Sequence, residues 1–227
     1  MKILSIDTST SAGSIVLAED ERILGEISID SAETHSVRLL NGIDYLLKSL
    51  VLHLSDVDAF AVISGPGSFT GVRIGLTTIK GLAETMGKPT IPLTAFEAWA
   101  EKFPLELGVI IPLIDARRGE VYATVLERTD GRLHVLSDGM VDKPSQIFGM
   151  LNHDEILFIG DGAIRYHEVI SGCRRPRWSV ATSDVFLGRS MARLAYQKGI
   201  KNEFTSALDL KAYYLRKSDA ELYWKDK

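Results

Sequence analysis

The first part of the chain alternates between short apolar runs and polar turns. Three such runs predict strands over residues 2–7, 14–18 and 22–29. Leucines and isoleucines then recur at helical spacing from Leu39 to Leu50, which predicts an amphipathic helix. We therefore expect three strands that lead into a helix.

The strand-to-helix step is then repeated. Residues 59–64 form a continuous apolar run, which predicts a buried strand. A second helix is predicted over 69–86, ended by Gly87 and Pro89. This order is typical of an α/β fold in which helices pack on a mixed sheet.

The second half of the sequence resembles the first. Ile114-Asp115 repeats Ile6-Asp7 at an offset of 108 residues, and in both places a turn follows. The second half then predicts strands over 121–127, 133–137 and 156–159, and a short helix opened by Pro144. We interpret this order as an internal duplication.

Two lobes follow from the duplication, over residues 1–102 and 103–227. Thr94 to Glu97 has capping-box spacing, which predicts a short helix near the boundary. A long C-terminal helix is predicted over 184–198 in the second lobe, with Ser183 as its cap and Gly199 as its end.

Composition adds constraints on location and partners. The chain has 227 residues, of which 45% are apolar and 25% charged, so a disordered protein is excluded. We expect a cytoplasmic protein without a membrane segment, because no signal-peptide pattern is present and Cys173 is the only cysteine. The net charge is 26 − 30 = −4, so any contact with RNA requires a local basic patch or a partner.

Asp7 and Asp115 each end the first strand of a lobe, just before a turn. If the two turns face each other across a cleft, the pair can hold a metal-bound nucleotide phosphate. The alternative is that each aspartate caps its own turn. Arg117 and Arg118 make the second turn bulky, and can bind an anion or pair with acidic groups of a partner.

Residues 65–71, Gly-Pro-Gly-Ser-Phe-Thr-Gly, form the most distinctive stretch. They fit neither of the two common glycine-rich nucleotide-binding patterns. Gly67 and Ser68 stand at a predicted helix N-terminus, where free N–H groups attract anions. A sharp turn without a ligand explains the glycines equally well, so both interpretations stay open.

The two helices of the first lobe carry small residues beside polar ones. We expect these faces to bind another subunit, although simple packing of the two helices on each other is the alternative. The candidate residues are Arg38, Gly42, Tyr45, Leu46, Gly71, Arg73, Gly75, Thr78 and Leu82.

Patterns typical of catalytic sites are missing. The five histidines are scattered, with no pair at metal-binding spacing, and no nucleophile elbow occurs. We therefore predict no catalytic residue and no metal site.

Three stretches together resemble a known family. Residues 3–10 (ILSIDTST), 64–76 (SGPGSFTGVRIGL) and 114–122 (IDARRGEVY) are similar, in order and spacing, to the TsaB (YeaZ-type) tRNA threonylcarbamoyladenosine biosynthesis family. Tyr214-Leu215-Arg216 also resembles the family's ending, although Ala212 replaces the proline that usually precedes it.

The resemblance implies a duplicated actin-like ATPase fold, of the ribonuclease H-like class, with two lobes. It implies a non-catalytic subunit that pairs with TsaD, the enzyme that transfers a threonylcarbamoyl group to N6 of adenosine 37 in tRNA. His35 has Leu39 four residues on, where TsaD has the second histidine of its metal pair.

The resemblance also implies further partners: the ATPase TsaE, a second copy of this chain, and tRNA through the complex. It implies no cofactor of the chain's own, with ATP or ADP at the interface of the complex. An actin-fold ATPase or kinase with its own substrate is the alternative, disfavoured by Arg117 and Arg118 in the second turn. A metal peptidase is disfavoured by the missing histidine pair.

Overall fold

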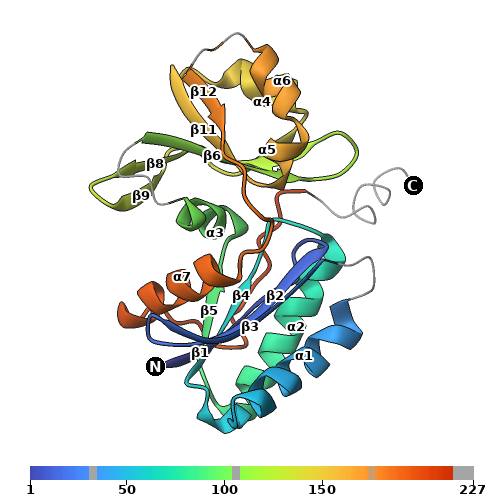
Figure 1. Cartoon of the computed structure of the whole chain (residues 1–227), viewed down its shortest axis with the longest axis vertical. Coiled ribbons are helices and arrows are strands. Elements are labelled where there is room, and N and C mark those ends of the chain that lie inside the picture. The colour runs from blue at the N-terminus through green and yellow to red at the C-terminus, as the bar shows by residue number, and fades with distance from the viewer. Residues whose placement is uncertain (31–34, 104–107, 174, 176, 217–227) are drawn as a thin grey trace. The chain divides into compact units, whose positions relative to one another are not determined.

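A computed structural model describes residues 1–30, 35–103, 108–173, 175 and 177–216. The chain forms two compact units, each with its own sheet and core (Figure 1). The first unit comprises Met1–Lys102 and Phe186–Tyr213, and the second comprises Phe103–Val185 and Tyr214–Lys227.

The sheet of the first unit has the strand order β3-β2-β1-β4-β5. The first three strands form an antiparallel meander, and the last two run parallel to β1. The strands are β1 (Lys2–Asp7), β2 (Ala12–Glu19), β3 (Arg22–Asp30), β4 (Ala59–Ile63) and β5 (Thr90–Leu93).

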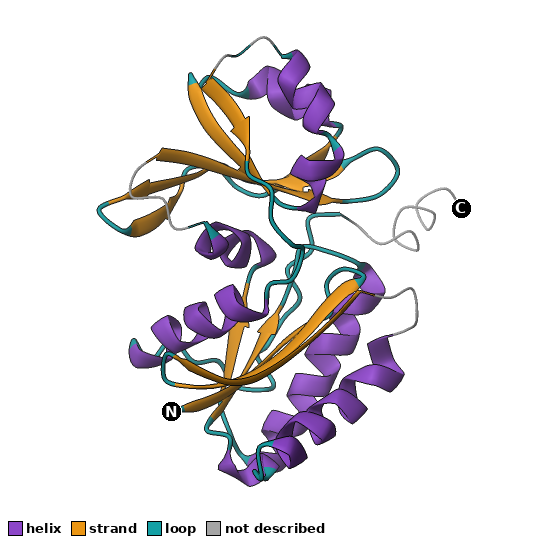
Figure 2. Ribbon diagram, in the orientation of Figure 1, coloured by secondary structure: helices purple, strands orange, loops and turns teal. Residues whose placement is uncertain are grey.

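Helices cover both faces of this sheet (Figure 2). Two pack on one face, where Leu4 and Ile6 of β1 join the main core. These are α1 (His35–Ser49) and α2 (Phe69–Met86), linked through the short 3-10 helix η1 (Leu54–Asp56) and β4. The opposite face contacts α7 (Gly188–Ile200), which also packs against α3 (Ala95–Lys102).

The sheet of the second unit has the order β10-β7-β6-β11-β12, and a hairpin of β8 and β9 extends beside β6. Its core includes the aromatic cluster Phe148, Phe158 and Trp178. The strands are β6 (Gly108–Asp115), β7 (Val121–Ala123), β8 (Leu126–Thr129), β9 (Arg132–Val135), β10 (Met140–Asp142), β11 (Glu155–Ile159) and β12 (Arg177–Val180). The helices are α4 (Pro144–Met150), α5 (Asp161–Arg165) and α6 (His167–Gly172).

The two sheets share one topology. In each, the central strand pairs antiparallel with the strand that follows it and parallel with a later one, and the five positions match in order and direction. The duplicated actin-like α/β fold expected from the sequence is confirmed.

The second meander differs from the prediction. The apolar run 121–127 is broken at Thr124 and Val125, because Thr124 donates its hydroxyl to the Ser137 carbonyl (2.7 Å) and the Val125 N–H donates to the Ser137 hydroxyl (3.0 Å). Residues 126–135 therefore form the separate β8–β9 hairpin, in which β8 pairs with the first residues of β6 and β9 pairs with β8. The counterpart of β3 is β10 rather than the predicted strand 133–137.

The C-terminal helix also differs from the prediction. It begins at Gly188 after Leu187, not after Ser183, whose hydroxyl donates to the Asp184 carbonyl instead. It includes Gly199, and its residues pack on the first sheet rather than on the second lobe. Among the described residues, no helix is both long enough and apolar enough to cross a membrane.

Candidate functional site

The turn that opens α2 is shaped by close backbone contacts with the turn after β1. A Cβ atom on Gly67 would lie 2.5 Å from the Ser9 carbonyl oxygen, and one on Gly71 would overlap the Thr8 carbonyl oxygen. The Ser68 N–H donates to the Ser9 carbonyl (2.6 Å). The glycines are thus needed for packing within this unit.

Gly65 in the same turn has a second neighbour. Its φ of 129° favours glycine, and a Cβ atom there would overlap the carbonyl oxygen of Tyr213. The Tyr213 N–H donates to the Ser64 carbonyl (2.8 Å). Ser68 caps α2, since its hydroxyl accepts from the Gly71 N–H (3.3 Å). These contacts favour the sharp-turn interpretation, and an anion contact at Gly67 and Ser68 stays a prediction.

Asp7 and Asp115 occupy equivalent positions and make the same local bond. The Asp7 carboxylate accepts from the Ser9 N–H (2.8 Å), and the Asp115 carboxylate accepts from the Arg117 N–H (3.0 Å). Each aspartate therefore caps its own turn, which was the alternative weighed from the sequence. Asp7 is only 1% exposed. Their role in nucleotide binding stays a prediction.

The second oxygen of Asp115 lies among arginines. Arg165 of α5 approaches this Oδ2 atom at 2.8 Å, and Arg117 approaches it at 3.5 Å. Both guanidinium groups are more than half exposed, whereas the Asp115 side chain is 10% exposed. The sequence predicted Arg117 and Arg118 as candidate anion contacts. It did not point to Arg165, which lies 50 residues beyond Asp115.

Asp161 holds the start of α5 against β6. Its carboxylate accepts from the Asp115 N–H (3.2 Å) and from the Gly162 N–H (2.9 Å). Burial raises the pKa of Asp161 above its usual range, although these backbone bonds oppose the shift. Close approach also explains the two glycines here, because a Cβ on Gly160 or Gly162 would meet the Leu113 carbonyl oxygen.

Arg216, near the end of the described chain, binds the turn that follows β6. Its guanidinium donates to the Ala116 carbonyl (2.8 Å) and pairs with the Glu120 carboxylate. The same group lies over the Tyr122 ring, 5.7 Å from its centroid. Burial raises the pKa of Tyr122, and the Arg216 charge opposes that shift. The sequence feature that could have pointed to this contact is the resemblance of residues 214–216 to the end of the family's sequences.

The nine residues predicted to bind a partner divide into two groups. Gly42, Gly71 and Gly75 face the chain's own sheet, since an added Cβ would meet Ile15 and Thr8 side-chain or backbone atoms. Leu46 is 4% exposed and belongs to the core. The other group lies at least partly at the surface: Arg38, Tyr45, Arg73, Thr78 and Leu82.

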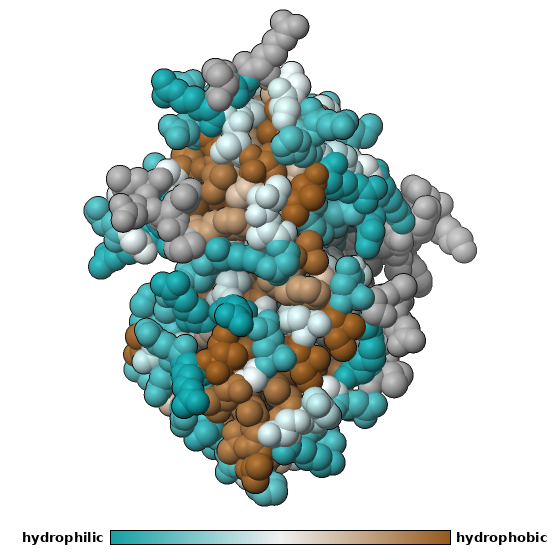
Figure 3. Space-filling view, in the orientation of Figure 1, coloured by the Kyte–Doolittle hydropathy of each residue, from teal (hydrophilic) through white to brown (hydrophobic). Residues whose placement is uncertain are grey.

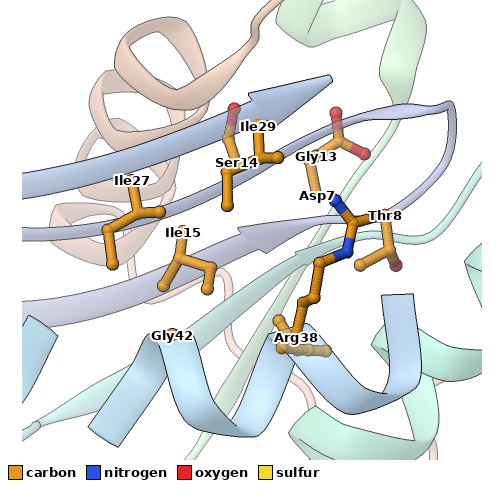
Figure 4. Close-up of a pocket in the computed structure, with 10 residues that line it drawn as sticks. Asp7, Thr8, Gly13, Ser14, Ile15, Ile27, Ile29, Arg38 and Gly42 are labelled. Atoms are coloured by element: carbon orange, nitrogen blue, oxygen red, sulfur yellow. The ribbon is translucent and has the colours of Figure 1, made fainter. Parts of the chain in front are cut away.

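A small hollow lies between α1 and the adjoining strands β2 and β3. Its lining is mostly apolar, and Arg38 rises from α1 at one end, near Asp7 and Thr8 (Figure 4). Apolar atoms gather at the surface of the first unit over this region (Figure 3). The lining residues are Asp7, Thr8, Gly13, Ser14, Ile15, Ile27, Ile29, Arg38, Leu39 and Gly42.

Comparisons with known proteins agree with the motifs. The family model described as "TsaD: tRNA N6-adenosine threonylcarbamoyltransferase" matches residues 22–208. The chain is 30% identical over 226 residues to the tRNA threonylcarbamoyladenosine biosynthesis protein TsaB of Bacillus subtilis, and this match covers 99% of the chain and 98% of the relative. A similar match to TsaB of Haemophilus influenzae has 31% identity and covers 99% and 96%.

A solved structure extends the likeness to three dimensions. YeaZ from Pseudomonas aeruginosa superposes with a TM-score of 0.80 at 28% identity, over 94% of this chain and 99% of that one. Because full-length sequence matches and the fold agree, the chain belongs to the TsaD family and, within it, to the TsaB group of tRNA threonylcarbamoyladenosine biosynthesis proteins.

Proposed function

We propose that this chain is a non-catalytic subunit that pairs with TsaD and supports the transfer of a threonylcarbamoyl group to N6 of adenosine 37 in tRNA. The observation that carries the proposal is the match to TsaB proteins over practically the whole chain. A match over both units, rather than over one, supports the same role for the whole protein.

The absence of a catalytic role is supported by residues at the expected site positions. Leu39 stands four residues after His35, so the sequence lacks the metal-binding histidine pair of TsaD. The carboxylate of Asp115 is occupied by Arg165 and by its own turn. Two arginines with positive φ fill the turn that would have to approach a phosphate closely. An ATPase or kinase is therefore the less favoured function.

The surface of α1 is the proposed contact with TsaD. Tyr45 is 67% exposed and Leu40 is 55% exposed, and both belong to the helix that borders the apolar hollow. Burying large apolar side chains drives most protein association, and aromatic residues are enriched in the centre of interfaces. Arg73, Thr78 and Leu82 of α2 extend the proposed surface, whereas the glycines act inside the unit.

Co-purification with TsaD tests the pairing, and a tRNA modification assay tests the role. We expect a stable pair whose modification activity is lost when this chain is omitted. Tyr45→Asp should weaken the pair at least tenfold, because a charge replaces an exposed aromatic ring that the proposed interface buries. Leu208→Asp is the matched control: Leu208 is 80% exposed in the same unit but outside α1 and α2. Full activity of TsaD alone would overturn the proposal.

The same pair allows the remaining partners to be tested. We propose that TsaE joins the pair, that the free chain self-associates through the α1 surface, and that the complex works in the cytoplasm.

We also propose that ATP or ADP binds at the interface of the complex and not to this chain alone. Calorimetry with ATP should show binding to the complex only. Robust ATP turnover by the isolated chain would favour the actin-fold ATPase instead.

A further inference from the structure

We propose that the hollow between α1 and the strands β2 and β3 receives one apolar side chain of TsaD. This inference rests on the proposed function, because it takes TsaD to be the protein that covers α1. It adds a specific contact to that function: the occupant of the hollow is an uncharged aliphatic or aromatic side chain, and it belongs to the partner protein.

A glycine interrupts a row of large side chains on the α1 face beside the hollow. Steps of four and three residues place Arg38, Gly42 and Tyr45 on one face of the helix. Arg38 lines one end of the hollow, and Tyr45 is 67% exposed. Because Gly42 between them has no side chain, the helix surface has a gap at this position.

The floor of the hollow consists of aliphatic side chains of the sheet. Ile15 of β2 and Ile27 of β3 project toward α1 near Gly42 (Figure 4). A Cβ atom on Gly42 would lie 2.5 Å from the Cδ1 atom of Ile15, so the glycine lets the helix lie close to β2. Among the described residues, Ile27 and its neighbour Ile29 remain only partly covered.

The hollow adjoins the edge of the first sheet. β3 is the outermost strand, and no described strand pairs with its outer side. Ile29 of β3 is 43% exposed, whereas Leu39 on the α1 wall is 4% exposed. A protein that packs along α1 and contacts Tyr45 therefore also covers this part of the surface, which makes the hollow continuous with the proposed TsaD contact.

The polar groups that line the hollow are already engaged within the chain. The Thr8 hydroxyl donates to the Gly71 carbonyl (2.7 Å), and the Ser14 hydroxyl lies 3.2 Å from that of Ser28. The Asp7 carboxylate caps its own turn. Sites for polar small molecules present convergent polar groups, and a bound water needs about two to four polar partners. We therefore expect an apolar occupant.

The size of the hollow favours a single side chain. Its volume is about 360 Å³, which includes the part open to solvent. This is at the small end of the range for ligand pockets, roughly 300 to 1,000 Å³. Because the walls belong to the helix and strands of one unit, filling them costs this chain little conformational entropy. Side chains that fill such pockets carry much of the affinity of an interface.

The test compares two substitutions at Ile27 and measures affinity for TsaD. Ile27→Phe places a larger ring in the hollow, whereas Ile27→Leu keeps the volume. We expect the affinity to fall about tenfold or more in the phenylalanine variant, because the ring excludes the partner's side chain. It should stay close to the parent in the leucine variant. The midpoint of urea unfolding should be similar in both variants, since the ring occupies space that the free chain leaves empty.

A second control lies outside the hollow. Ile200 is 58% exposed at the end of α7, on the opposite face of the sheet, so Ile200→Phe should not change the affinity. Equal losses in this control and in Ile27→Phe would overturn the proposal. If Ile27→Phe does not fold, Ile29→Phe blocks the hollow from a partly exposed position and is judged by the same outcomes.

Methyl NMR of the parent chain gives a direct readout that a change in stability would not imitate. The Cδ1 methyl signals of Ile27 and Ile29 should shift when TsaD is added, while that of Ile200 should not. Unchanged signals at Ile27 and Ile29 in a formed pair would overturn the proposal.

The remaining outcomes identify the occupant and separate this inference from the proposed function. If Ile27→Phe loses self-association in analytical ultracentrifugation but keeps its affinity for TsaD, the hollow serves a second copy of this chain and the assignment to TsaD is overturned. If Tyr45→Asp weakens the pair and Ile27→Phe does not, the inference fails while the pairing through α1 stands. No pairing of the parent chain with TsaD would overturn both.

Discussion

The hydroxyl of Thr8 donates a hydrogen bond to the carbonyl oxygen of Gly71, 2.7 Å away and 63 residues later in the chain. This bond joins the turn after β1 to the first turn of α2, and both groups are buried. The glycine-rich stretch 65–71 is thus part of the first unit's own packing. Its distinctive composition reflects how closely two backbones approach.

Gly71→Ala should destabilise the protein by about 1–3 kcal/mol, the usual cost of forcing extra volume into a packed core. The added methyl group would meet the Thr8 carbonyl oxygen, which is backbone and cannot rotate away. Urea unfolding measures the loss. Gly81→Ala in the same helix is the control, since nothing lies within 4 Å of an added Cβ there. It should stabilise by up to about 1 kcal/mol, because alanine favours helix.

Thr94→Ala should cost about 1 kcal/mol by removing the cap of α3. The Thr94 hydroxyl accepts from the Glu97 N–H (3.1 Å), and the Glu97 carboxylate accepts from the Thr94 N–H (2.9 Å). Thr94→Ser keeps the hydroxyl and should be close to the parent in thermal unfolding. Equal destabilisation by both variants would show that the methyl group, and not the cap, matters.

Arg216→Ala should destabilise the second unit by about 1.5–3 kcal/mol, the range for hydrogen bonds to charged groups. It removes the donor to the Ala116 carbonyl and the partner of Glu120. Amide hydrogen exchange should become faster at Ala116 and Glu120 while the first unit is unaffected. Lys211→Ala, an exposed residue of the first unit, provides the control.

Asp161→Asn should alter the dependence of stability on pH. The pKa of Asp161 is raised by burial, so its contribution to stability is greatest below its unfolded value near 3.8 and declines as the pH rises through the folded pKa. Asparagine retains an oxygen that accepts from the Asp115 and Gly162 N–H groups but carries no charge. The variant should therefore gain stability relative to the parent between pH 4 and 7, values that lie above the usual aspartate pKa. Parallel melting curves at every pH would contradict this.

Local patterns predicted most of the first unit. The alternation of β1 to β3 and the helical periods of α1 and α2 follow from binary patterning, and Gly87 ends α2 in the left-handed conformation as expected. The repeated Ile-Asp pair also pointed to the correct duplication. These features depend on neighbours in sequence.

Features that depend on residues distant in the sequence were harder to predict from the sequence. The break at Val125 requires Ser137, and the start of α7 at Gly188 lies against the carboxylate of Glu26, whose Oε2 atom is 3.5 Å from Arg189. No strand was predicted over Arg177–Val180, which forms β12 because β11 offers it a parallel partner from Glu155 to Phe158. The periodicity of apolar residues along the chain does not reveal which distant residues a segment will contact.

The candidate site follows the same division. The sequence singled out Asp7 and Asp115 because each ends a strand, and their shared role in capping a turn was foreseen as an alternative. It also suggested that the helix glycines serve a partner, whereas Gly42 and Gly75 meet their own sheet. Spacing along a helix places residues on one face but does not say what covers that face.

The discontinuous make-up of the first unit has a consequence for biosynthesis. Its sheet stays uncovered on the α7 side until residues 186–213 leave the ribosome, after the whole of 103–185 has been made. All strands and core residues of the second unit precede residue 186, so the first unit receives its last core elements later than the second unit does. This reverses the usual order in which N-terminal domains fold first during translation. A nascent chain stalled near residue 185 would therefore expose the α7-facing side of β1 to chaperones.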